Sequence, residues 1–403
     1  MLTRQQIDKA AENLQGVIRQ TELIYSPYYS KTLGTPLYLK CENLQHTGAF
    51  KIRGAYNFLF QQSPEVLAAG VVTASAGNHA QGLASAAALL NCPCRVVMPE
   101  GTPLAKELAT LEYGAKVELH GNNCAEAESY ARQLAEQEGL LYVSAFDHEL
   151  IMAGQGTIGL EILHDLPALD TLLVPIGGGG LIAGIAAAIK SEKPEVKIVG
   201  VEAACVASAS LARRNGHPKY LSTRCHTFAE EVAVKQIGEL TFPIIEKYVD
   251  EIVTVEEESI ARAIVSLMEK EKLIVEGAGA VGLAALLYGL KTIHKGNTVC
   301  LLSGGNLELP NMARVVEQGM LAEGNYLKLR LEIVDMPGAL AHLTNIISEL
   351  KSNIFQISHD RNKSSLPLGE AEVLLDLETR GPEHIQEILM RLEDERYRPE
   401  VIR

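Results

Sequence analysis

The sequence lacks the excess of basic residues that proteins need to bind phosphate-rich surfaces. Its 403 residues contain 36 Lys and Arg against 50 Asp and Glu, for a formal net charge of −14. Because nucleic acids and anionic lipid surfaces are bound by basic faces, neither is expected as a partner. The length exceeds what one ordinary core needs, and 47% of the residues are apolar, so we expect two packed domains.

The cysteines show no spacing typical of a disulfide framework or a metal site. There are seven, an odd and scattered set, and Cys92-Pro93-Cys94 is too closely spaced for a zinc knuckle or a redox pair. We therefore expect free thiols in a reducing cytoplasm. The chain starts with the polar, helix-like stretch MLTRQQIDKAAENL, which predicts no signal peptide.

A long unbroken hydrophobic run is also missing. The nearest approach is TLLVPIGGGGLIAGIAAAI, from Thr171 to Ile189, which carries no charge and nearly reaches the length of a membrane-spanning helix. Pro175 and four consecutive glycines interrupt it. A strand, a glycine loop and a helix are therefore predicted here, and no membrane partner is expected.

What the sequence does contain is a regular alternation of β-rich and helical segments from about residue 36 to about 305. This alternation is typical of βα units around mostly parallel sheet, so the fold class is α/β. Several predicted strands run into small or polar residues, in SAGNH, GGGG and SGGN. Ligands of such folds bind beyond the carboxyl ends of the strands. The predicted strands are 36–43, 70–76, 94–100, 116–121, 140–146, 171–177, 197–203 and 298–304.

After Pro310 the pattern changes. Residues 315–326 have the composition of a connector. The rest predicts a ferredoxin-like βαββαβ unit with its own small core. Its strands are predicted at 326–335, 353–360, 369–379 and 397–403, and its helices at 339–351 and 382–393. The chain is thus predicted to form one domain over residues 1–320 and a second over 327–403.

The glycine run suggests a binding site for an anion. Gly177, Gly178, Gly179 and Gly180 follow a predicted strand and precede an apolar helix. Their N–H groups can converge on an anion, and the start of the helix adds a partial positive charge, so phosphate is the favoured ligand. Tight packing of helix on sheet is the alternative. A dinucleotide fingerprint fits less well, because only its relaxed form matches GGGLIA.

Lys51 lies in the stretch TGAFKIRGA, between apolar neighbours and bracketed by Gly48 and Gly54. Its ordinary interpretation is a surface lysine with a partly covered stem. Partial desolvation would lower its pKa and make it nucleophilic. A nucleophilic lysine together with a phosphate cradle predicts pyridoxal 5'-phosphate, held as a Schiff base.

Two further polar residues follow predicted strands. Ser303, in LLSGGN, would hydrogen-bond the ring nitrogen of that cofactor, although a turn or cap role is the simpler interpretation. A hydroxyl cannot stabilise a full pyridinium as a carboxylate does, which favours prompt loss of a β-substituent. Asn78, in SAGNHAQG, offers an amide to the cofactor, with capping of a helix as the alternative.

These motifs, together with GQGTIGLEI, resemble those of the fold type II pyridoxal-phosphate enzymes, whose catalytic domain is tryptophan synthase β-like. Within them, residues 5–320 resemble the threonine dehydratases, or threonine ammonia-lyases. The tail, with IVDMPGALAHL, resembles an ACT regulatory domain. The resemblance implies a cytoplasmic homodimer or homotetramer that converts L-threonine to 2-oxobutanoate and ammonia, with L-serine as a secondary substrate. This reaction can open isoleucine biosynthesis.

The resemblance also implies a role for each matching residue. Lys51 would bind the cofactor and then act as the base at Cα, and Ser303 would meet the pyridine nitrogen. Phe50 would lie against the ring edge, and Asn78 would bond the 3'-oxygen. The phosphate would be bound by Gly177, Gly178, Gly179 and Gly180. The loop that takes the substrate carboxylate would contain Ser75, Asn78 and His79.

The sequence departs from the resembled family in ways that leave the substrate open. TFAEEVAV has Glu230 and Glu231 where these dehydratases usually have Asp-Gly, and SAFDH replaces HPFDD. Glu202 matches a metal-site acid of related enzymes, but Ser208 replaces the second, so no metal is expected. A serine racemase or dehydratase, a dehydratase of another β-hydroxy amino acid, a β-replacement synthase and a non-catalytic amino-acid sensor stay open. For the tail, isoleucine is the obvious allosteric effector, with valine, serine or no ligand as alternatives.

Overall fold

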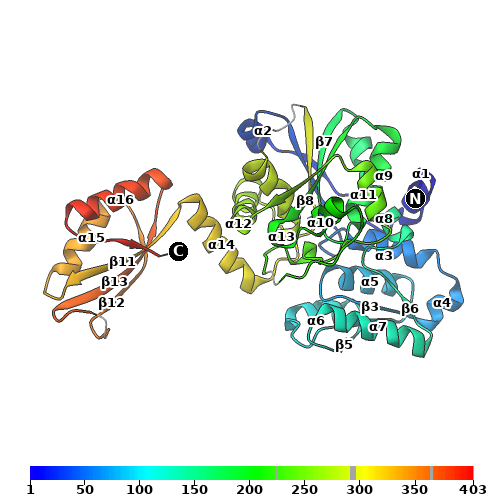
Figure 1. Ribbon diagram of the computed structural model, residues 1–403, viewed down its shortest axis with the longest axis horizontal. Helices are drawn as coiled ribbons and strands as arrows, with labels where there is room; N and C mark the ends of the chain where they lie inside the picture. The colour runs from blue at the N-terminus through cyan, green and yellow to red at the C-terminus, as the bar shows by residue number, and fades with distance from the viewer. Residues whose placement is uncertain (224–225, 291–295, 364–365, 403) are drawn as a thin grey trace. The chain divides into compact units, whose positions relative to one another are not determined.

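The computed structural model describes residues 1–403 apart from 224–225, 291–295, 364–365 and 403. The chain divides into two compact units, Met1–Asn311 and Met312–Arg403 (Figure 1). Each unit has its own hydrophobic core. The division lies close to the change of pattern after Pro310 and ahead of residue 320, where the first domain was predicted to end. Among the described residues, no helix has both the length and the apolar character that crossing a membrane requires.

The first unit contains two sheets. The larger has six strands in the order β1-β2-β10-β7-β8-β9, and β1 is antiparallel to its neighbour whereas the other described pairs are parallel. The central strands β7 and β10 are almost continuously buried, as expected for parallel strands with both faces covered. The strands are β1 (Leu23–Tyr25), β2 (Leu37–Cys41), β7 (Leu169–Pro175), β8 (Lys197–Ala203), β9 (Glu251–Val255) and β10 (Asn297–Leu302).

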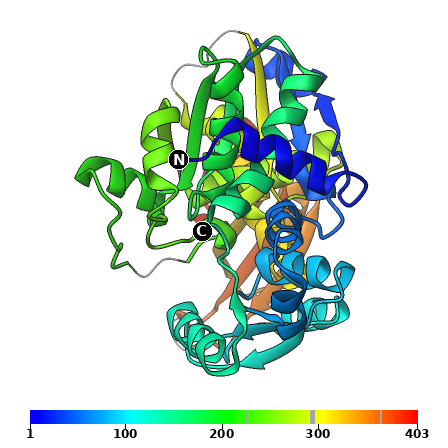
Figure 2. The ribbon, with the colours of Figure 1, turned by 90° about the vertical axis from the view of Figure 1, so that its right-hand side faces the viewer.

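The smaller sheet is entirely parallel, in the order β5-β4-β3-β6. It lies in the cyan, lower part of the unit in Figures 1 and 2. All eight strands predicted before residue 305 are present, whereas β1 and β9 were not predicted. The strands are β3 (Val71–Ala74), β4 (Cys94–Met98), β5 (Lys116–Leu119) and β6 (Leu141–Tyr142), and three helices of this part of the chain are α5 (Asn78–Leu89), α6 (Leu104–Glu112) and α7 (Cys124–Glu138).

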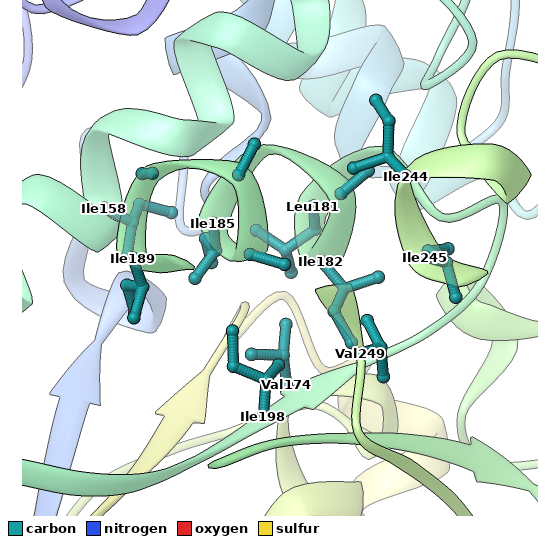
Figure 3. Packing of buried hydrophobic residues seen from close by; sticks show 14 of the residues in the cluster. Ile158, Val174, Leu181, Ile182, Ile185, Ile189, Ile198, Ile244, Ile245 and Val249 are labelled. Carbon is teal, nitrogen blue, oxygen red and sulfur yellow. The ribbon is translucent and has the colours of Figure 1, made fainter. Parts of the chain in front are cut away.

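The main core lies between the six-stranded sheet and the helices that follow its strands. Figure 3 shows α9 (Gly180–Glu192) pointing Ile182 and Ile185 toward Val174 of β7 and Ile198 of β8. The uncharged run from residue 171 to 189 is therefore a strand, a glycine loop and a buried helix, as predicted. The other α-helices that begin in this unit are α1 (Arg4–Leu14), α2 (Pro27–Leu33), α3 (Lys51–Phe60), α4 (Pro64–Ala69), α8 (Glu149–Asp165), α10 (Ser208–Asn215), α11 (Phe242–Tyr248), α12 (Glu257–Ser266), α13 (Gly277–Ala284) and α14 (Leu309–Glu323), the last of which belongs mostly to the second unit.

The second unit has the predicted βαββαβ order. Its four strands form an antiparallel sheet in the order β12-β13-β11-β14. Alternate residues of β11 are buried, including Leu329 and Leu331, which gives the strand one core face. The predicted connector lies largely within α14. The elements are β11 (Tyr326–Val334), α15 (Ala339–Glu349), β12 (Ile354–Asp360), β13 (Glu370–Glu378), α16 (Pro382–Asp394) and β14 (Glu400–Val401).

Among the cysteines that the structure describes, all but one are free thiols, as predicted. Free thiols are found at Cys41, Cys92, Cys94, Cys124 and Cys300. Cys205 is disulfide-bonded, so the prediction was wrong for this residue, because spacing alone does not reveal which segments the fold brings together. Cys225 lies outside the described residues.

Candidate active site

Four helices begin at one pocket of the first unit. They are α3, α5, α9 and α13, and in none of the four does the N-cap residue make a side-chain hydrogen bond to the first turn. The start of a helix carries a partial positive charge and unpaired N–H groups, so this convergence favours bound anions. The pocket is lined by Phe50, Lys51, Asn78, Ala145, Phe146, Gln155, Pro175, Gly177, Gly178, Gly179, Gly180, Leu181, Glu231, Val232, Glu276, Ala278 and Ser303.

Lys51 is the first residue of α3 and reaches into this pocket. Its Nζ donates a hydrogen bond to the carbonyl oxygen of Ala145 at 3.2 Å. Burial lowers the pKa of Lys51, and the negative charges of Glu231 and Glu276 only partly oppose that change. A lysine with a lowered pKa is neutral more often at pH 7, and is therefore a better nucleophile and base.

The glycine loop connects β7 to α9 and faces the same pocket. Gly179 has a φ of 95°, which favours glycine. A Cβ at Gly178 would lie 2.3 Å from the ring of Phe146, and one at Gly179 would lie 2.7 Å from Oγ1 of Thr241. Tight packing therefore explains why these positions are glycine, which was the alternative to phosphate binding in the sequence analysis. The same packing leaves the loop backbone lining a pocket opposite a lysine, and this arrangement fits the phosphate of the predicted cofactor.

Ser303 follows the carboxyl end of β10 and also lines the pocket. Its carbonyl oxygen accepts a hydrogen bond from the backbone N–H of Phe50 at 3.2 Å. The neighbouring residues Ala49 and Gly304 form a β-bridge. These contacts fix the segment before Lys51 against the end of β10, so the lysine and the serine hydroxyl lie in one site although 252 positions separate them in the sequence.

Asn78, the first residue of α5, is held by two partners. Its Nδ2 donates to Glu276 at 2.7 Å, and its Oδ1 accepts from Nδ2 of Asn306 at 2.7 Å. Nδ2 of Asn306 also donates to the carbonyl oxygen of Thr47 at 2.8 Å, and because a carbonyl can only accept, these contacts determine which way the two amides point. Glu276 was not predicted. Burial and the charge of Glu231 raise its pKa. The available signal was an acidic residue directly before the glycine-rich helix GAGAVGLA.

Ser75 and His79 were predicted to take part in substrate binding, but neither is among the described residues that line the pocket. Oγ of Ser75 accepts a hydrogen bond from the N–H of Gly77 at 3.3 Å, so it supports the turn before α5. His79 is buried, and burial together with the charge of Lys51 lowers its pKa to about 3. Its Nε2 lies 3.4 Å from the carbonyl oxygen of Val143, so the ring contacts the backbone of the protein at this position. Direct contact of these two residues with substrate stays a prediction.

The two adjacent glutamates that depart from the family pattern face different ways. Glu230 is exposed and pairs with Lys106 at 2.8 Å. Glu231 lines the pocket, and its charge acts on Lys51. Both belong to the short 3-10 turn Glu230–Val232. Only one of the two departures therefore changes the site itself.

Glu202 is satisfied within the protein. Its carboxylate accepts hydrogen bonds from the N–H of Ala209 at 2.7 Å and from the N–H and Oγ of Ser210 at 2.9 and 2.7 Å. Within the part of the chain that the structure describes, no group of three or more His, Cys, Asp or Glu side chains is arranged to hold a metal ion. The carboxylate of Glu202 thus stabilises the start of α10.

The helix α8 sets the spacing between Lys51 and the glycine loop. A Cβ at Gly154 would lie 2.5 Å from the carbonyl oxygen of Arg53 in α3, and one at Gly156 would lie 2.8 Å from the carbonyl oxygen of Gly184 in α9. Glycine therefore allows α8 to contact both helices at backbone distance. This explains the motif GQGTIG, whose function the sequence did not reveal.

A buried charge cluster anchors α3 from the side. Its members are Lys40, Glu42, Arg53 and Glu161, three of which are 0% exposed. Arg53, two residues after Lys51, binds Glu42 through Nε and one terminal nitrogen, at 2.8 Å each. It also donates to Glu161 at 2.6 and 3.0 Å, and Lys40 donates to Glu161 at 2.6 Å. The four charges balance, which allows their burial.

Comparison with known proteins gives one consistent result. A family model described as pyridoxal-phosphate dependent enzyme matches residues 14–304. The chain is 54% identical over 403 residues to an L-threonine ammonia-lyase of Geobacter sulfurreducens, covering 100% of both chains. A threonine deaminase of Solanum lycopersicum superposes with a TM-score of 0.75 at 39% identity, over 79% of this chain and 88% of that one. A maize serine racemase superposes with a TM-score of 0.75 at 31% identity, over 78% and 96%.

Proposed function

The chain belongs to the pyridoxal-phosphate dependent enzyme family, and from this premise we propose that it is a threonine ammonia-lyase, converting L-threonine to 2-oxobutanoate and ammonia. The observation that carries the proposal is the pocket in which Lys51, the glycine loop and Ser303 meet. The similarity over the full chain to a protein named L-threonine ammonia-lyase supports the choice of substrate.

In this proposal each group of residues in the pocket has a separate role. The four glycines and the start of α9 would hold the phosphate, Lys51 would bind the cofactor covalently, and Ser303 would meet the ring nitrogen. When bound, pyridoxal phosphate supplies an electron sink for the bond broken at Cα of the substrate. With the substrate bound, Nζ of Lys51 would accept the Cα proton, because its lowered pKa leaves the amine partly neutral.

The overall reaction balances without a further reactant. The substrate loses its Cα proton and its β-hydroxyl, which together amount to one water molecule. The enamine that is released then takes up one water molecule and gives 2-oxobutanoate and ammonia. Ser303 is a neutral partner for the ring nitrogen, so it does not hold a proton there as a carboxylate would. A weaker electron sink favours fast loss of the β-substituent.

The test is a steady-state comparison of L-threonine, L-serine and 3-hydroxyaspartate with product analysis. We expect kcat/KM for threonine to exceed that for serine roughly tenfold, because one buried methyl group contributes about that much discrimination. 2-Oxobutanoate should be the main product. Racemised serine as the main product would favour the racemase alternative, and a requirement for an added thiol would favour β-replacement. A holoenzyme that converts none of these amino acids would favour the alternative of a non-catalytic amino-acid sensor.

We also propose that the second unit is an ACT-like regulatory domain that binds an amino-acid effector at the turn before α15. Asp335-Met336-Pro337-Gly338 precedes this helix, and Gly338, its N-cap residue, has a φ of 92°. Among the described residues no side chain caps α15, so its first N–H groups suit a ligand carboxylate. Isoleucine is the first candidate, and valine and serine follow.

A pair of matched variants tests this proposal. A side chain at Gly338 would meet nothing within 4 Å, and both Asp and Asn tolerate a positive φ. Isoleucine should change the activity of the full chain by roughly 5–150-fold. Gly338→Asp should abolish that response by like-charge repulsion, whereas Gly338→Asn should keep most of it. Equal responses of wild type and both variants would place the effector elsewhere.

A further inference from the structure

The carboxylate of Glu231 occupies the start of α5 from inside the pocket. It lies against Gly77, because a Cβ at that glycine would be 2.0 Å from Oε1 and 2.7 Å from Oε2. The backbone N–H of the next residue, Asn78, lowers the pKa of this carboxyl and so favours its charged form. Gly77 is the N-cap residue of α5, a helix of 12 residues, and offers no side chain of its own. Glu231, from a distant segment, therefore supplies the acceptor that this helix start lacks.

The surrounding charges hold Glu231 only partly in this position. Lys106 and Lys51 attract its carboxylate, whereas Glu230 and Glu276 repel it. Burial raises its pKa, so the charged form is disfavoured there. Lys106 lies outside the lining of the pocket and binds Glu230 at 2.8 Å. Lys106 also favours the charged form of Glu231, so that carboxylate does not depend on the start of α5 alone.

We propose that Glu231 occupies the position that the carboxylate of the amino-acid substrate takes, so that it is an internal competitor which the substrate displaces. This inference deepens the proposed function and rests on it for the class of ligand. The structure already places a carboxylate against Gly77, at the start of α5, in the pocket that contains Lys51. The start of α5 is therefore already shaped to bind the carboxylate of a free amino acid.

The other three helix starts at the pocket suit the substrate carboxylate less well. The start of α9 follows the glycine loop, which is assigned to the phosphate. The start of α13 has Glu276 as its N-cap residue, whose side chain is already bound there by Nδ2 of Asn78 at 2.7 Å. The start of α3 is Lys51 itself, and the N–H of the preceding Phe50 is bound to the carbonyl oxygen of Ser303. The start of α5 is left as the position next to Lys51.

An internal competitor weakens the binding of the substrate in a way that other defects do not reproduce. The apparent affinity for the substrate falls by the fraction of molecules in which the position is open. The loss applies to ligands with a carboxylate and spares amines without one. Removing the charge of Glu231 should therefore tighten the binding of amino acids, in contrast to the weakening that follows the loss of a residue which contacts substrate.

The experiment measures binding of L-alanine and of ethylamine to the holoenzyme by titration calorimetry. L-Alanine has no β-substituent to lose, and ethylamine is the same molecule without the carboxylate. Glu231→Gln should bind L-alanine roughly tenfold more tightly, with ethylamine unchanged. Glu230→Gln removes the same charge from the adjacent, exposed residue, and should leave the affinities for both ligands as in the wild type.

The readout is the ratio of the two affinities within each protein, which cancels differences in cofactor content or folded fraction. Glu231→Gly serves as a second variant if the glutamine folds poorly, and should shift the ratio in the same direction. An unchanged ratio in both variants, or weaker binding of L-alanine, would contradict the proposal that Glu231 competes with the carboxylate of the substrate. A holoenzyme that binds L-alanine as expected but does not convert threonine would instead overturn the proposed function, so the two failures are distinguishable.

Discussion

Lys51→Ala should lose nearly all turnover while the protein still retains pyridoxal phosphate through the glycine loop. The variant lacks both the amine that binds the cofactor and the base at Cα, and general-base contributions alone are about 10²–10⁴-fold. We therefore expect kcat to fall by at least about 10³-fold. Steady-state kinetics measure the loss. Borohydride trapping followed by mass spectrometry should find no cofactor bound to the chain.

Lys51→Arg is the matched control for this variant, because it keeps a positive charge next to Glu231 and Glu276 but cannot act as a nucleophile at neutral pH. It should be as inactive as the alanine variant. Adding ethylamine to Lys51→Ala should restore part of the rate, since a free amine can replace the missing base. A variant that retains the wild-type rate would show that the catalytic lysine lies elsewhere.

The placement of Lys51, Asn78, Gly177 and Ser303 in one pocket could be predicted because each follows the carboxyl end of a strand or starts a helix. In parallel sheets such ends meet at a common edge. The division into two sheets could not be predicted in this way. β3 belongs to the smaller sheet and β7 and β10 to the larger, but both kinds of strand have the same apolar pattern in the sequence.

The contacts that hold the site together could not be predicted from the sequence for a different reason. Asn78 binds Glu276 and Asn306, which lie 198 and 228 positions further along the chain. Such pairs depend on how the starts of α5 and α13 face each other, and no local pattern carries that information. The same holds for Glu230 and Glu231, where one turn directs the second residue into the pocket and the first toward Lys106.

The charge cluster around Arg53 leads to the second prediction of large effect. Arg53→Met should destabilise the first unit by about 3–5 kcal/mol, because the buried cluster is left with two carboxylates and one lysine, and so with one uncompensated negative charge. Burial alone would raise the pKa of Glu42, but the charge and hydrogen bonds of Arg53 outweigh it and lower that pKa. Thermal unfolding of the holoenzyme should show a fall in Tm of roughly 10 °C.

The double variant Arg53→Met with Glu42→Leu separates stability from the positioning of Lys51. It removes one positive and one negative charge and leaves Lys40 paired with Glu161 at 2.6 Å. Since a buried pair replaced by apolar residues of similar volume is often neutral, most of the lost stability should return. Arg53 is in the first turn of α3, two residues after Lys51, so kcat should stay roughly tenfold below that of the wild type. If kcat recovers together with Tm, the cluster stabilises the fold without positioning the lysine; if neither recovers, Glu42 has a further role of its own.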